Sequence, residues 1–147
     1  MQPLEKFKER LSELMFYRGN MSSQKLSDAI KVNASTIRRW MSGKLNIKLS
    51  RALKLADFFE CSLEFLFGRS EKMLDFVIYP ALPFFEQLNE IMKKKNINKE
   101  IFIKDLKKSH GHFYFWEKGG DPSMHTVIDL ADYLDCTLDY LTGRERK

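Results

Sequence analysis

With 147 residues, of which 44% are hydrophobic and 31% charged, the chain has the composition of one folded domain or two small ones and not of a disordered segment. The net charge of +5 is uneven, because residues 1–70 contain 13 Lys and Arg against 7 Asp and Glu (+6), whereas residues 71–147 contain 12 against 13 (−1). The longest apolar run, at 73–85, is too interrupted to span a bilayer, and the charged residues 1–10 do not fit a signal peptide, so we expect a cytoplasmic protein without membrane contact.

The first 70 residues have the pattern of five short helices. Apolar residues at steps of three and four predict a first amphipathic helix, which Gly19 and Asn20 end. Polar residues that can accept hydrogen bonds from free helical N–H groups precede three of the other helices: Ser22 or Ser23 the second, Asn33 the third and Ser62 the fifth. The apolar stripes predict the inner faces of the first and fourth helices, with Leu4, Phe7, Leu11 and Leu14 on the first and Leu49, Leu53, Ala56 and Phe59 on the fourth.

The segment at 21–44 combines a packed inner face with a cationic outer face. Its two predicted helices meet at a tight turn near Lys31, and Leu26, Ile30, Val32, Ile37 and Trp40 are spaced to pack them together. The third helix then presents small and polar residues at its start and two arginines one turn later, and arginine suits guanine O6 and N7. Since the basic half of the chain favours a polyanionic partner, this face predicts nucleic-acid binding.

This segment resembles the helix-turn-helix of phage repressors and Cro proteins, the xenobiotic-response-element (XRE) family with a lambda-repressor-like fold. The resemblance covers most of residues 7–69, and the family pattern is matched by Leu26, Ser27, Val32, Asn33, Thr36, Ile37, Trp40 and Gly43. Lys31 stands where the family usually has glycine, and Ile47 where it often has proline; neither change blocks binding, since Lys31 need only tolerate the turn conformation.

The resemblance also implies a binding mode, in which the helix at 33–42 enters the major groove of double-stranded DNA. The implied base-facing residues are Ala34, Ser35, Thr36, Arg38 and Arg39. The implied phosphate contacts are Ser22, Ser23, Asn33, Ser42, Gly43 and Lys44.

The second half of the chain repeats the first. Residues 56–69 match residues 131–144 without a gap, with seven of the fourteen positions identical, and residues 40–43 match 116–119. We therefore expect an all-α protein with two tandem five-helix lambda-repressor-like helix-turn-helix domains, at 1–70 and 84–147, joined by an apolar linker at 71–83. The apolar stripes of the second copy contain Phe85, Leu88, Ile91, Met124, Val127, Ile128, Ala131 and Leu134, with Ser109 as a helix cap.

The linker residues 74–79 could form an extended strap, a helix extension or a pairing strand. An exposed apolar segment of this kind would promote aggregation, so we expect it to pack on a domain or on a partner chain.

The outer face of the second copy differs from that of the first. His110 and Gly111 fall at the start of its third helix, and Tyr114 and Phe115 stand where the first copy has two arginines. Exposed aromatic residues are typical of protein interfaces. We therefore favour an interaction or dimerisation face at His110, Tyr114 and Phe115 over a second, weaker DNA reader.

Other chemistry has little support in the sequence. Cys61 and Cys136 lie in apolar helical surroundings and are expected to be reduced, buried thiols. No histidine, cysteine or carboxylate spacing fits a metal site, and no nucleophile arrangement or phosphate-binding glycine loop is present. We expect no enzyme activity, no metal and no cofactor.

The leading hypothesis is a sequence-specific transcriptional regulator, a repressor or an antitoxin-like autoregulator, that binds DNA as a nucleoid-associated homodimer. The alternative is a protein-interaction module or antitoxin-like partner binder that keeps the fold, with the second domain binding protein.

Overall fold

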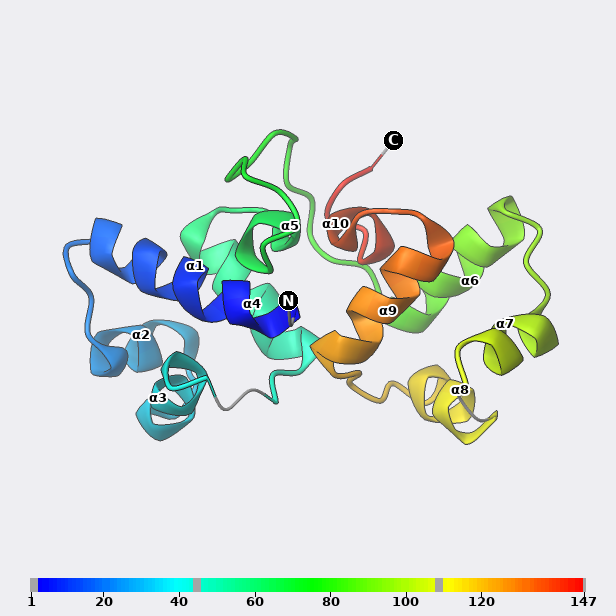
Figure 1. Ribbon diagram of the computed structural model, residues 1–147, viewed down its shortest axis with the longest axis horizontal. Coiled ribbons are helices and arrows are strands. Elements are labelled where there is room, and N and C mark those ends of the chain that lie inside the picture. Colours follow the sequence, from blue (N-terminus) through cyan, green and yellow to red (C-terminus); the bar gives the residue numbers. More distant parts are fainter. Residues whose placement is uncertain (1–2, 44–45, 108–109, 147) are drawn as a thin grey trace. The chain divides into compact units, whose positions relative to one another are not determined.

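The computed structural model describes residues 3–43, 46–107 and 110–146, and these residues form ten α-helices and no β-strand (Figure 1). The prediction of an all-α protein is therefore confirmed. The chain divides into two compact units: an N-terminal unit, Met1–Asp75 with Ser123–His125, and a C-terminal unit, Phe76–Pro122 with Thr126–Lys147. Among the described residues, no helix is both long enough and apolar enough to cross a membrane.

The N-terminal unit contains α1 to α5, which run from blue to green in Figure 1. Their bounds are Pro3–Tyr17, Ser23–Ile30, Ala34–Met41, Leu49–Phe59 and Leu63–Leu66. Helix α1 packs against α3 and α5, while α2 packs against α3 and α4. All four apolar residues predicted for the inner face of α1 are buried. On α4, Leu53 is half-buried, and Ala52 and Leu55 complete the core instead, because the buried stripe of that helix is centred one residue away from the predicted one.

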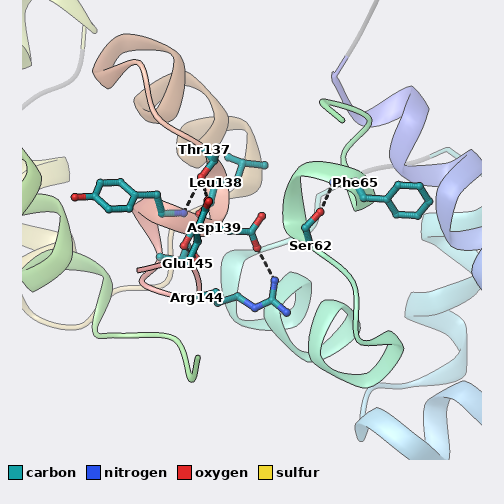
Figure 2. Close-up of polar contacts among 9 residues, drawn as sticks. Ser62, Phe65, Thr137, Leu138, Asp139, Arg144 and Glu145 are labelled. Carbon is teal, nitrogen blue, oxygen red and sulfur yellow. Dashed lines mark hydrogen bonds and ion pairs between the residues drawn. The ribbon is translucent and has the colours of Figure 1, made fainter. Parts of the chain in front are cut away.

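Hydrogen bonds at the helix starts agree with two of the three predicted caps. The hydroxyl oxygens of Ser22 and Ser62 accept from the backbone N–H of Lys25 and Phe65, at 3.1 and 2.9 Å (Ser62 in Figure 2). The predicted cap by the Asn33 side chain is wrong, because no such hydrogen bond forms. The N–H of Thr36, which a capping side chain would accept from, donates instead to the Asn33 carbonyl at 3.0 Å.

The C-terminal unit contains α6 to α10, with bounds Phe84–Lys94, Lys99–Asp105, His110–Glu117, Met124–Leu134 and Leu138–Leu141. Helix α6 packs against α8 and α10. The core includes edge-to-face ring pairs, of which Phe102 with Phe113 is one, with ring centroids 5.7 Å apart. Asn98 caps α7, and the Thr137 hydroxyl both caps α10 and donates to Glu145 (Figure 2). The cap predicted at Ser109 lies outside the described residues.

The same backbone conformations recur in both units. Left-handed residues 76 positions apart are Asn20 and Asn96, Lys31 and Lys107, and Gly43 and Gly119. Left-handed residues 75 positions apart are Glu60 and Asp135, and Gly68 and Gly143. Since non-glycine residues rarely adopt positive φ, their recurrence at matching helix ends is informative. The two units turn in the same way at corresponding places.

Residues 71–83 form an irregular strap, in which residues 74–79 belong to neither a helix nor a strand, so the helix-extension and pairing-strand alternatives are wrong. Within the N-terminal unit, the carbonyl of Met73 accepts from Ser62 N–H at 2.8 Å. Within the C-terminal unit, Tyr79 N–H donates to the carbonyl of Arg144 at 2.9 Å, and the guanidinium of Arg146 lies 4.6 Å from the centre of the Tyr79 ring. Each part of the strap is thus held by its own unit.

Candidate nucleic-acid interface

The turn between α2 and α3 accommodates a lysine at the position where the family that this segment resembles usually has glycine. Lys31 adopts the left-handed conformation, with φ 60° and ψ 44°, and its N–H donates to the carbonyl of Ser27. This conformation costs a non-glycine residue about 1–2 kcal/mol. Since the turn forms as expected, the departure at Lys31 does not disturb the position of α3.

The orientation of α3 is set by its buried side. Ile37 and Trp40 are almost fully buried, and the Trp40 ring meets the Phe7 ring of α1 edge to face, with centroids 6.2 Å apart. Because α3 has 3.6 residues per turn, this anchoring turns the remaining positions outward. Of the predicted base-facing residues, Ser35, Arg38 and Arg39 are exposed, while Ala34 and Thr36 are half-buried at the edge of the helix.

The two arginines of α3 are exposed cations on this face. Within the described part of the chain, neither Arg38 nor Arg39 has an ion pair or a side-chain hydrogen bond. Both lie in the last turn of α3, where the helix dipole favours positive charge. Their guanidinium groups are therefore free to meet phosphates or base edges.

The predicted phosphate-contact residues lie at three places: the start of α2, the residue before α3 and the end of α3. At the start of α2, Ser22 is exposed and Ser23 is half-buried, and the Ser22 oxygen accepts in its cap, so its hydroxyl proton remains available to a phosphate. The Asn33 side chain is exposed and makes no cap hydrogen bond.

Donors at the end of α3 are already used within the fold. The Ser42 hydroxyl donates to the carbonyl of Arg39 at 2.8 Å, and the N–H groups of Ser42 and Gly43 donate to carbonyls of α3. Lys44 lies outside the described residues. The strongest candidates for phosphate contact are therefore those at the start of α2 together with Asn33.

The corresponding face of the C-terminal unit has different chemistry. His110 is 2.8 Å from a carboxylate oxygen of Glu100, so its ring is engaged with an acidic residue that would repel a phosphate. Tyr114 and Phe115 are 61% and 50% exposed. The three predicted interaction residues therefore lie at the surface, and they form an aromatic rather than a cationic face.

Two polar contacts of the C-terminal unit were not predicted from the sequence. The Arg144 guanidinium pairs with the carboxylate of Asp139, both fully buried, and the Tyr133 hydroxyl donates to Asp105 at 2.7 Å (the Arg144 pair in Figure 2). This hydrogen bond, together with desolvation and the charge of Asp105, raises the pKa of Tyr133 above its usual 10.0. The described residues contain no group of three His, Cys, Asp or Glu that could hold a metal ion.

Comparison with known proteins supports the assignment of this segment. A helix-turn-helix family model matches residues 17–66, which include α2 to α5. The match supports the XRE-type helix-turn-helix family for this part of the chain, and with it a DNA-binding regulatory class of domain that is not enzymatic. Searches of the curated proteins and of the solved structures each found no match.

Proposed function

We propose that the protein is a sequence-specific transcriptional repressor that reads the major groove of double-stranded DNA with residues 33–42. This proposal rests on Arg38 and Arg39, which are exposed on the outer side of α3 and have no ion-pair partner among the described residues. The matched family, whose members bind DNA through this motif, supports the same reading. In a cell, we expect the protein in the cytoplasm, associated with the nucleoid.

We further propose that the chain contains two tandem lambda-repressor-like domains, of which the first reads DNA. The recurring left-handed turns and the repeated sequence at 56–69 and 131–144 support this arrangement. The second domain has lost the arginines, and we propose that it joins two chains into a homodimer with help from the strap at 76–79. A dimer would place two α3 helices on half-sites about 34 Å apart, one turn of DNA.

Selection of bound duplexes from a random DNA pool tests this function. We expect enrichment of one short motif, present as two inverted copies about one helical turn apart. A pool that remains random after several rounds would contradict sequence-specific binding. A single enriched motif without an inverted partner would contradict the dimeric arrangement and leave the reading by α3 in place.

The alternative function is a protein-interaction module, which the exposed Tyr114 and Phe115 favour. In this case the helix-turn-helix fold would be kept without DNA reading, as in an antitoxin-like partner binder. The two functions differ in their salt dependence, because each phosphate contact makes log K fall by about 0.9 per unit of log[salt]. Affinity for duplex DNA that does not change between low and moderate salt would favour the interaction module.

A further inference from the structure

A cavity of about 540 Å³ opens in the C-terminal unit, between the start of α6 and the end of α8. The rings of Phe84, Phe85 and Trp116 line it together with the side chains of Glu86 and Glu117, and no Lys, Arg or His belongs to the lining. Neither glutamate has an ion-pair partner in the part of the chain that the structure describes. The cavity therefore combines aromatic rings with two uncompensated negative charges.

The N-terminal unit contains the same arrangement of aromatic rings, with different charges around it. The edge-to-face pair Phe84 and Trp116, with centroids 5.8 Å apart, has its counterpart in Phe7 and Trp40, and this correspondence aligns α6 with α1. In α1 the ammonium group of Lys6 lies 3.5 Å from the carboxylate of Glu9. In the C-terminal unit these positions are occupied by Pro83, which precedes α6, and by Glu86 of α6, so the carboxylate is kept and the lysine beside it is replaced by a proline.

Two further differences also make this part of the C-terminal unit more negative than its counterpart. Phe85 replaces Lys8, whose stem passes close to Gly43 at the corresponding edge of the N-terminal unit. Glu117 replaces Met41, and it is the last residue of α8, where the helix dipole disfavours a negative charge. The fold needs none of these changes, because the N-terminal unit forms the same arrangement of rings with a net positive instead of a net negative charge around it.

We propose that this cavity binds an arginine side chain of a partner polypeptide. A guanidinium group is planar, so it can stack on an aromatic ring while its N–H groups donate to a carboxylate. A cation would be attracted by both the aromatic rings and the glutamate carboxylates, whereas a phosphate or another anion would be repelled by the carboxylates. The volume is within the range of about 300–1,000 Å³ that is usual for ligand pockets.

The surroundings of the cavity favour a polypeptide over a free small cation. The Phe115 ring of α8 covers Gly120, which lines the cavity, and about half of the Phe115 side chain is exposed. The cavity therefore adjoins the aromatic face of α8, which the proposed function assigns to protein contact. The inference rests on that part of the proposal and is independent of DNA reading by α3.

The test uses the ¹⁵N-labelled full chain and N-acetyl-arginine amide as the probe. We expect a saturable shift of the Trp116 indole N–H signal, assigned by comparison with a Trp40→Phe variant. The neutral isostere N-acetyl-citrulline amide should cause no saturable shift, and N-acetyl-lysine amide should bind more weakly than the arginine compound, because its ammonium group lacks the planar fork. Absence of a saturable shift, or equal binding of the citrulline compound, would overturn the proposal.

Glu117→Met is the decisive variant, because methionine is the residue at this position in the N-terminal unit. It should weaken binding of N-acetyl-arginine amide about tenfold or more, and its thermal unfolding should match or exceed that of the wild type. Glu90→Gln is the matched control, since Glu90 is an exposed carboxylate of α6 outside the cavity lining. Wild-type binding by Glu117→Met, or an equal loss in Glu90→Gln, would show that the cavity does not hold the guanidinium. Unchanged DNA binding by Glu117→Met would show that the two proposals are separate.

Discussion

Removal of either arginine side chain from α3 should weaken DNA binding without weakening the fold. Arg38→Ala and Arg39→Ala are each expected to lower affinity for the selected duplex by about 1–3 kcal/mol, a factor of about 5 to 150, if the arginine contacts a base edge. If the arginine contacts only a phosphate, its removal should instead lower affinity for all sequences and reduce the salt slope by about 1.

The structure limits the cost of these substitutions to the fold. Both side chains are exposed, and neither leaves a buried partner behind, so no uncompensated charge is created. The remaining term is the interaction with the dipole of α3, about 0.3–1 kcal/mol for each arginine. The free energy of unfolding should therefore fall by less than about 1 kcal/mol.

Fluorescence anisotropy with a labelled duplex, repeated at several KCl concentrations, measures both affinity and salt slope. Lys54→Ala is a matched control, because it removes an exposed cation of α4 that is not among the predicted DNA contacts. If both arginine variants bind the selected site as tightly as the wild type, the assignment of α3 to the groove is wrong. Equal losses in Lys54→Ala would indicate a general charge effect.

Three further predictions concern the core, a titrating hydroxyl and the two units. Trp40→Ala and Trp116→Ala should each cost about 3–5 kcal/mol in chemical denaturation, because both rings are almost fully buried; wild-type stability would show the packing argument to be mistaken. Because the pKa of Tyr133 is raised, its hydrogen bond to Asp105 stabilises the fold at neutral pH, and this stabilisation is lost as the pH rises above 10. Tyr133→Phe should therefore show a smaller decline in the free energy of unfolding between pH 9 and 11 than the wild type. An identical decline would refute this. A fragment of residues 1–75 should stay folded and bind one half-site weakly, while the full chain should sediment as a dimer; a full chain that remains monomeric on DNA would favour tandem reading by both units.

The spacing of apolar residues was sufficient to predict the helical core, because a helix with a period of 3.6 residues must bury one face. Phe7, Leu11, Ile37 and Trp40 are buried as this rule requires. The same rule could not distinguish Leu53 from Leu55 on α4, since the neighbouring helices decide where a broad stripe is centred.

The sequence could not predict a helix cap that competes with another hydrogen bond, or contacts that depend on how the helices pack together. Asn33 has the residue type of a helix cap, yet the amide it would cap finds a backbone carbonyl instead. The Arg144 and Asp139 side chains are fully buried, while the corresponding pair Arg69 and Glu64 is partly exposed, although the repeat gives both pairs the same spacing. The cavity beside Trp116 depends on the packing of α6 against α8, which no local pattern encodes.

Replacing single purines of the selected site with 7-deazapurines tests most directly whether α3 reads the major groove. This change removes N7, an acceptor of the major groove, and leaves the minor groove unchanged. We predict that one or two such changes in each half-site weaken binding by about 1–3 kcal/mol, and that Arg38→Ala or Arg39→Ala becomes insensitive to the change at the purine which that arginine contacts. Wild-type affinity for every 7-deazapurine duplex, combined with weaker binding when inosine removes the guanine amino group of the minor groove, would contradict the account.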